Sequence, residues 1–241
     1  MAEHTNKQFD VDLERIRTQF LQMGGVVEAM IQESVDALTT GDMALVERVL
    51  EREKEVNRHE VEIDEKVTQI LARHQPTAID LRTLLAVTKM LTDMERSGDE
   101  AEKISTVARR IYEDDHRFMP VIELRHMANC VRSMIHQTMD AFARHDSVLA
   151  AAVVRSDKEV DKEWKSAMRN LISYMIEDPR TISRGIDLLF IARSMERIGD
   201  HCKNMAERVI YMVHGADVRH QGVKMAERLV REETEGAAPK E

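Results

Sequence analysis

The sequence contains little of what interrupts or crosslinks a polypeptide chain. Of its 241 residues, nine are glycine, four are proline and two are cysteine, and only 4% are aromatic. Scarcity of glycine and proline favours long helices, because these two residues destabilise helix interiors. The two cysteines, Cys130 and Cys202, form no CxxC motif and suggest no disulfide framework, so we expect reduced thiols.

Strand signals and long hydrophobic runs are also missing. No alternating apolar and polar run bounded by turn residues predicts a strand. The densest apolar run, 186–192, is far shorter than the roughly 20 residues of a membrane span, and the first residues contain no apolar signal region. We therefore expect a cytoplasmic all-α protein that associates with membranes only through partners.

The charge balance excludes a further class of function. The net charge is −9, with 44 acidic and 35 basic residues, which disfavours nucleic-acid binding because phosphate contacts need clustered Lys and Arg. No Walker loop, dinucleotide fingerprint, nucleophile elbow or zinc-ligand spacing is present, so an enzyme is not favoured. The acidic excess instead suits metal cations or a basic surface on a partner.

Apolar residues spaced three and four apart predict helices over residues 10–39, about 43–73, and from the break at 75–77 to about 113. Val11 in the first helix, and Leu81 and Leu85 in the third, belong to these apolar stripes. Asp42 is placed to cap the second helix.

The pattern then restarts, with the segment 127–135 resembling 23–31. Further matches lie 104 residues apart, then 103 for Pro76 and Pro179, and 101 for the acidic motifs described next. The decrease of the offset from 104 to 101 residues fits small loop deletions in a tandem duplication. We predict six long helices in two three-helix bundles related by a pseudo-twofold axis. The expected domains are residues 1–115 and 121–215, followed by a polar, partly disordered tail over 216–241.

One acidic motif occurs in both repeats. Glu95 and Asp99 are four residues apart in the first, as are Glu196 and Asp200 in the second, so each pair leaves its helix on one face. Carboxylate oxygens are ligands for hard cations such as Mg, Mn, Ca or Fe. A solvated acidic helix face explains the same pattern, and both interpretations stay open.

The second helix of each repeat offers additional oxygens. Glu53 and Asn57 in the first repeat match Asp157 and Asp161 in the second. These side chains are further candidate ligands, although a solvated face is the more common explanation.

Two other features of the motif need a structural reason. Gly98 and Gly199 precede the two Asp residues, and glycine inside a helix costs about 1 kcal/mol relative to alanine. Close packing against the first helix of each repeat is the favoured reason. Arg96 and Arg197 are expected to pair with an acidic residue one turn away.

These motifs, together with the segment 75–82, resemble the PhoU family of phosphate-transport accessory regulators. The family's acidic motif maps onto Glu95 with Asp99 and onto Glu196 with Asp200. The resemblance implies two three-helix bundles and metal bound at the motifs, in some members as multinuclear clusters. Asn204 is a further candidate ligand in the second copy only, since the first has Lys103 there. Fe, Mn, Mg and Zn all remain candidates for the metal.

The resemblance also implies negative regulation of the phosphate-starvation response. The expected partners are the ATPase subunit of a phosphate ABC transporter, a phosphate sensor histidine kinase and a second copy of the chain. Two alternatives stay open: a carboxylate-bridged di-metal protein with redox or hydrolytic activity, and a helical scaffold that binds no metal.

Overall fold

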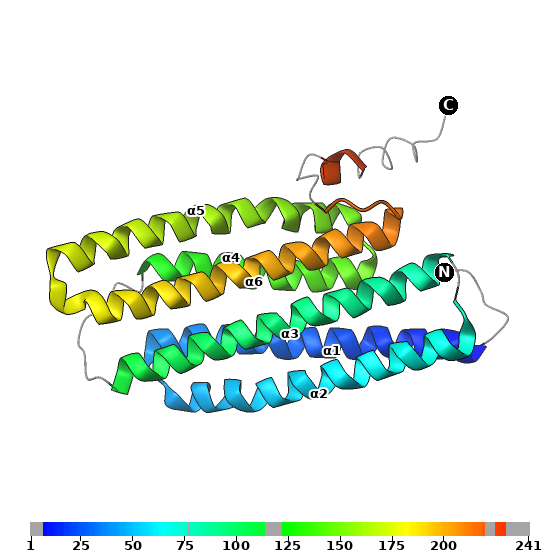
Figure 1. Cartoon of the computed structure of the whole chain (residues 1–241), viewed down its shortest axis with the longest axis horizontal. Helices are drawn as coiled ribbons and strands as arrows, with labels where there is room; N and C mark the ends of the chain where they lie inside the picture. Colours follow the sequence, from blue (N-terminus) through cyan, green and yellow to red (C-terminus); the bar gives the residue numbers. More distant parts are fainter. Residues whose placement is uncertain (1–6, 77, 114–121, 220–224, 230–241) are drawn as a thin grey trace.

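The computed structural model describes residues 7–76, 78–113, 122–219 and 225–229. Within these residues the chain forms helices and no strands, which confirms the predicted all-α fold (Figure 1). A 3-10 turn, η1 (Pro179–Thr181), precedes the last long helix, and a short helical segment covers 225–229. The long helices are α1 (Lys7–Thr40), α2 (Met43–His74), α3 (Ala78–Glu113), α4 (Ile122–Arg144), α5 (Ser147–Glu177) and α6 (Ile182–His214).

Equivalent aspartates begin the second helix of each repeat. Asp42 Oδ1 accepts a hydrogen bond from the backbone N–H of Ala44 at 2.9 Å, as predicted, and Asp146 Oδ1 accepts one from Leu149, also at 2.9 Å. Each bond satisfies a backbone donor that has no partner inside the helix. Gly215 ends α6 with a left-handed backbone at φ 73°.

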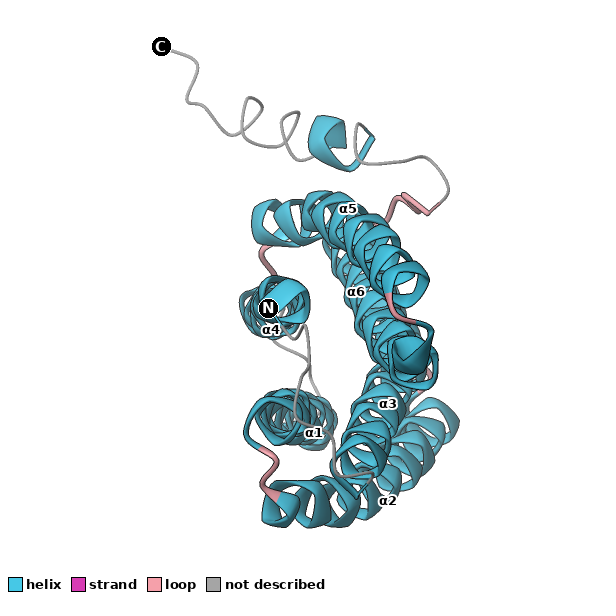
Figure 2. Cartoon of the chain, turned by 90° about the vertical axis from the view of Figure 1, so that its left-hand side faces the viewer, coloured by secondary structure: helices cyan, strands magenta, loops and turns pink. Residues whose placement is uncertain are grey.

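The helices form two three-helix bundles, α1–α3 and α4–α6, that lie side by side (Figure 2). The bundles meet along α3 and α6, and also along α1 and α4. Helices α3 and α6 run antiparallel, because Arg110 pairs with Asp187 near one end and Asp93 contacts His201 beyond the middle. The predicted duplicated bundle is therefore confirmed.

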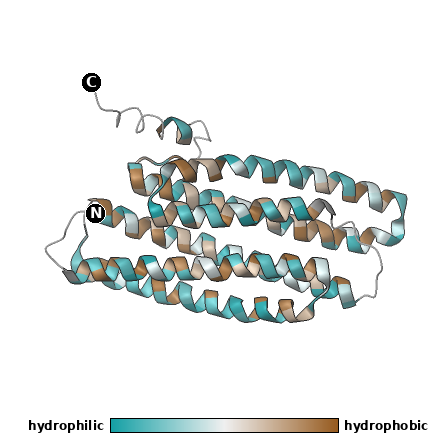
Figure 3. Ribbon diagram, turned by 180° about the vertical axis from the view of Figure 1, so that it is seen from behind, coloured by the Kyte–Doolittle hydropathy of each residue, from teal (hydrophilic) through white to brown (hydrophobic). Residues whose placement is uncertain are grey.

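Hydrophobic and hydrophilic residues are interspersed along the long helices (Figure 3), and the apolar side chains pack into a core rich in methionine. Met23, Met94 and Met195 are among the buried members. The flexible thioether chain of methionine fills gaps between helices that are offset from one another. The predicted apolar stripes therefore form most of the core.

Three residues of the predicted apolar stripes lie on the surface instead. Val11, Leu81 and Leu85 are exposed, by 60%, 36% and 42%. They lie within the first two turns of α1 and α3, where one face of the helix points away from its neighbours. Periodicity reveals that a stripe exists but not how far along the helix a neighbour covers it.

The chain beyond α6 packs back onto the second bundle. Val218 and Ala226 are almost fully buried, and Arg155 of α5 pairs with Glu227 at 3.2 Å between Nη1 and Oε1. The described part of the region predicted as a polar tail therefore contacts the bundle. The expectation of partial disorder concerns residues 220–224 and 230–241, which lie outside the described residues.

Among the helices that the structure describes, none contains an apolar stretch long enough to cross a lipid bilayer.

Candidate metal centre

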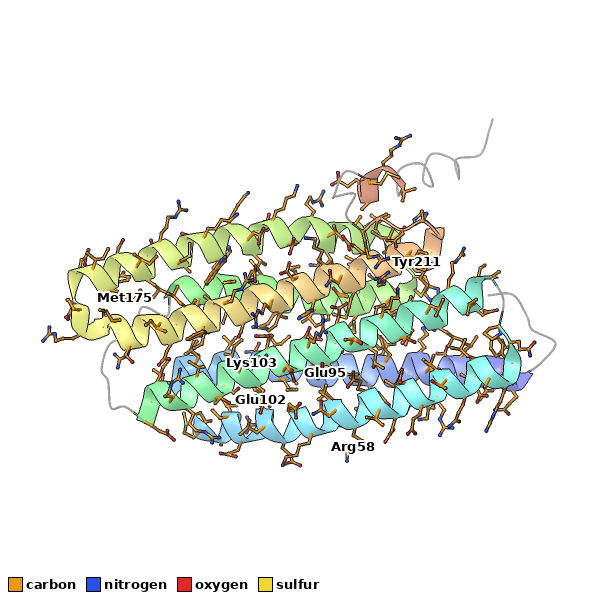
Figure 4. All side chains as sticks on the ribbon, in the orientation of Figure 1. Arg58, Glu95, Glu102, Lys103, Met175 and Tyr211 are labelled. Atoms are coloured by element: carbon orange, nitrogen blue, oxygen red, sulfur yellow. The ribbon has the colours of Figure 1, made fainter. Side chains whose placement is uncertain are left out.

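Three carboxylates from two helices converge in the first bundle. One oxygen each of Glu53 on α2 and of Asp99 and Glu102 on α3 lie within 4.8 Å of one another. All three side chains are partly buried. Glu102 lies on the stretch of α3 that runs alongside α2 (Figure 4). Such an all-oxygen set from a protein suits a hard cation that keeps several water ligands.

The surface of α2 and α3 around the three carboxylates carries further acids, and we call this surface the acidic face. Burial raises the pKa of Glu95, and the neighbouring charges of Asp99 and Glu60 raise it further. Burial also raises the pKa of Glu102, with Glu53 and Asp99 adding to the effect. These groups resist ionising together, and a bound cation would relieve their repulsion.

The sequence pointed to Glu95 with Asp99, but the converging set replaces Glu95 with Glu102. Asp99 and Glu102 are three residues apart, a spacing that also shares a helix face, so the motif extended by one turn would have revealed it. Asn57 is exposed and donates its Nδ2 hydrogen to Glu53 Oε1 at 2.6 Å. Asn57 therefore positions Glu53, and Glu53 is the residue that faces α3.

Matching acids also converge in the second bundle. Asp157 and Asp161 come from α5, and Glu196 and Asp200 from α6. Burial raises the pKa of Asp200, and the charge of Asp157 raises it further. Burial also raises the pKa of Glu196, as do the charges of Asp200 and Asp161. All four predicted acids of this repeat therefore belong to one electrostatic cluster.

This second cluster contains its own cations. Lys203 Nζ lies 2.6 Å from Asp157 Oδ2, and Arg193 Nη1 lies 2.6 Å from Glu196 Oε1. Asp157 and Glu196 are 6% and 8% exposed, so these are ion pairs of buried carboxylates. Within the described chain, only the acids of the first bundle form a set with metal-ligand proximity.

Asn204 forms a hydrogen bond with an acid of the other repeat. Its Nδ2 donates to Asp93 Oδ1 at 3.2 Å, and the same oxygen lies 2.9 Å from His201 Nδ1. Asp93 belongs to α3, so Asn204 and His201 help join the two bundles.

Arg197 was expected to pair within its own helix, and the structure corrects this. Its Nη1 contacts Oε1 of Glu100 on α3 at 3.2 Å, because α3 packs directly against α6. Glu100 is 4% exposed and also binds Lys103 at 3.0 Å. Burial alone would raise the pKa of Glu100, but hydrogen bonds from Ser194, Lys103 and Arg197 outweigh it and lower the pKa. Arg96, the matching residue, is exposed.

The two motif glycines allow close packing, but mainly against the second helix of each bundle rather than the first. A Cβ on Gly98 would lie 3.4 Å from Val56 Cγ1 of α2, with Met30 and Val27 of α1 slightly farther away. A Cβ on Gly199 would lie 3.3 Å from Val160 Cγ1 of α5.

Replacement by alanine should change the stability differently at Gly98 and at Gly199. Gly98→Ala should raise the free energy of unfolding by about 0.5 kcal/mol, because helix propensity improves and the new methyl group fits at van der Waals distance. Gly199→Ala should gain less, or lose stability, because the branched Val160 side chain must shift. Urea unfolding of both variants measures the difference, and an equal gain at both positions would contradict this account.

We also expect the stability of the metal-free protein to depend on pH through the acidic face. Because the pKa of Glu95 is raised by folding, its ionised form destabilises the folded state. Glu95→Gln should therefore raise the free energy of unfolding in EDTA near neutral pH, by about 0.5 kcal/mol. This gain should vanish as the pH falls through the raised pKa to about pH 4, where the carboxyl is protonated in both states.

Glu51→Gln is the matched control. Its hydrogen bond and charge interaction with Lys54 lower the pKa of Glu51, so no gain in stability is expected. Urea titrations at several pH values compare the two variants. A gain for Glu95→Gln that does not change with pH would contradict the electrostatic explanation.

Comparisons with a family model and with known sequences all match one protein family. The family model of the PhoU domain matches residues 20–108 and 124–209. A Pseudomonas putida protein, named phosphate-specific transport system accessory protein PhoU homolog, is 44% identical over 93% of this chain and 88% of its own length. The Escherichia coli K12 phosphate-specific transport system accessory protein PhoU is 41% identical over 95% of both chains.

Solved structures agree with the sequence matches. The crystal structure of PhoU from Pseudomonas aeruginosa has a TM-score of 0.84 and 44% identity, covering 86% of this chain and all of that one. The Streptococcus pneumoniae phosphate transport system regulatory protein PhoU has a TM-score of 0.80 at 24% identity over 87% of this chain and 99% of its own. At that identity the second match supports the fold alone.

Proposed function

Because this chain belongs to the PhoU family of phosphate-transport accessory proteins, we propose that it is a negative regulator of the phosphate-starvation response. It acts without catalysis of its own and holds that response off when phosphate is plentiful. The relatives' names, which describe accessory proteins of phosphate transport, are the observation that carries this proposal.

In this proposal the chain works in the cytoplasm and binds two partners. One is the ATPase subunit of the phosphate ABC transporter, whose uptake it modulates, and the other is the phosphate sensor histidine kinase. Membrane association occurs only through these partners. The chain acts as a homodimer, and exposed apolar residues on α6, Ile182, Ile186 and Phe190, offer a surface for association.

Metal binding is the second part of the proposal. Glu53, Asp99 and Glu102 would hold the ion, and Glu95 lies one turn along α3 from Asp99. The convergence of three carboxylates within 4.8 Å supports this, and a bound cation supplies the positive charge that the face lacks. Oxygen ligands suit Mg, Mn or Fe better than Zn, although Zn also accepts carboxylates.

The test of the regulatory role is alkaline phosphatase activity in phosphate-rich medium, in a strain of the source organism that lacks this gene. We expect high activity without the gene and repression when the wild-type gene is restored. A triple variant with Glu53, Asp99 and Glu102 changed to Gln should fail to restore repression. Activity that stays repressed without the gene would refute the regulatory role.

The matched control changes three exposed glutamates of α2, Glu51, Glu62 and Glu65, to Gln. It removes the same charge and should repress like the wild type. Equal repression by both triple variants would leave the regulatory role intact and refute a regulatory role for the metal. Turnover by purified protein loaded with Mn or Fe, and lost in the first triple variant, would favour a di-metal enzyme instead.

A further inference from the structure

The two acidic clusters are equivalent in position but differ at one decisive residue. Glu53 in α2 matches Asp157 in α5, and Asp99 in α3 matches Asp200 in α6. The third carboxylate of the first cluster is Glu102, and its match in α6, 101 residues later, is Lys203. One repeat therefore has a carboxylate where the other has an ammonium group.

In the first cluster, the nearby cations leave the converging carboxylates unpaired. Lys103, adjacent to Glu102, bonds the buried Glu100 at 3.0 Å. In the described part of the chain, Glu53, Asp99 and Glu102 form no ion pair, and Asn57 gives Glu53 only a neutral donor. The charge of Lys103 acts on Glu102 without a close ion pair, so the protein balances the negative charge of this cluster only in part.

In the second cluster, the cation is built into the helix. Lys203 Nζ lies 2.6 Å from Asp157 Oδ2, and the lysine side chain is about one-third exposed while the aspartate is almost fully buried. An ammonium group is a compact point charge with three donors, so it can satisfy a buried carboxylate as a metal ion would. Arg193 Nη1 pairs with Oε1 of Glu196 in the same cluster at 2.6 Å, whereas the buried Oε2 of Glu196 has no hydrogen-bond partner among the described residues.

We propose that the two repeats have become specialised. The first binds a metal cation, and in the second the ammonium group of Lys203 takes the place of the metal, so the chain binds one metal centre instead of two. This inference rests on the proposed metal binding. It explains why two acidic motifs with the same sequence spacing have different charge partners.

The test uses Mn²⁺ titrated into the purified full-length chain, with free Mn²⁺ followed by its electron paramagnetic resonance signal. Wild-type protein should show binding at one centre. Glu102→Lys should weaken that binding by at least about 100-fold, because loss of mere supporting contacts already costs 10–100-fold. Lys203→Glu should add a second class of bound Mn²⁺, roughly doubling the amount bound.

The double variant Glu102→Lys with Lys203→Glu exchanges the two residues and keeps the net charge. It should retain one centre, now in the second repeat, and further change of Asp200 to Asn should abolish it. Glu65→Lys and Lys165→Glu, exposed residues on α2 and α5, make the same charge changes elsewhere and should bind Mn²⁺ like the wild type. Circular dichroism confirms that each variant is folded.

The outcomes separate this inference from the metal proposal. Wild-type protein with two equal centres, or Lys203→Glu protein with no additional Mn²⁺ bound, would overturn the specialisation and leave metal binding intact. Wild-type protein that binds no Mn²⁺ would overturn both. Loss in Glu102→Lys together with gain in Lys203→Glu supports both.

Discussion

Replacing Phe142 with alanine should lower the free energy of unfolding by about 3–5 kcal/mol. Phe142 on α4 packs edge-on against Phe20 on α1, with ring centroids 4.9 Å apart, and both rings are essentially unexposed. The substitution removes a large apolar side chain and leaves a cavity where the two bundles meet. Urea unfolding followed by circular dichroism measures the loss.

Ile176→Ala is the control. Ile176 lies on α5 with 75% of its surface exposed, so truncating this apolar side chain to alanine should alter the free energy of unfolding by no more than about 0.5 kcal/mol. Tryptophan fluorescence of Trp164, in the second bundle, should show the same transition as circular dichroism if the bundles unfold together. A loss below about 1 kcal/mol for Phe142→Ala would mean that this aromatic contact does little to join them.

Replacing Lys203 with methionine should be the most destabilising change in the second acidic cluster, at about 2–3 kcal/mol. It removes the cation from a buried carboxylate, Asp157, and breaking a buried pair costs about 3–5 kcal/mol. We reduce the expected value because the lysine side chain is 33% exposed and water already screens part of the interaction.

The equivalent change in the first repeat should have the opposite sign. Glu102→Met removes one of several crowded carboxylates and should raise the free energy of unfolding of metal-free protein by about 0.5 kcal/mol. Urea unfolding in EDTA measures both variants. Destabilisation at both positions would show that the two clusters have similar charge balance, contrary to the structure.

The loss in Lys203→Met should also depend on pH. Burial and the charge of Asp157 raise the pKa of Asp200, and the charge of Lys203 works against that rise. Without the lysine, the pKa of Asp200 rises further above its unfolded value. The ionised form then destabilises the folded state more, and this penalty falls as the pH is lowered through the raised pKa. The difference from wild type should therefore be largest near neutral pH.

Features that depend on neighbours along the chain were predictable. The Asp42 cap and the shared face of Glu95 and Asp99 depend on helix geometry within one turn, which sequence spacing fixes. Glu102 also lies within reach of Asp99, since residues three apart share a helix face as well. Acids shared by both repeats do not include it, because the matching residue in the second repeat is Lys203.

Contacts between helices could not be predicted in the same way. Arg197 pairs with Glu100 across the bundles, and Asn204 with Asp93, because α3 and α6 pack antiparallel in one particular register. That register results from the fit of whole apolar faces, to which no single spacing in the sequence corresponds.

The sequence by itself determined the helices, the duplication and the pairs of acids that each helix presents, since all three follow from local periodicity and internal similarity. Only the tertiary structure decided how the acids are balanced. The rotation and offset of α2 against α3 bring Glu53 to Asp99 and Glu102, whereas α5 against α6 brings Asp157 to Lys203. Charge interactions weaken steeply with distance and exposure, so these placements determine which acidic face attracts a cation.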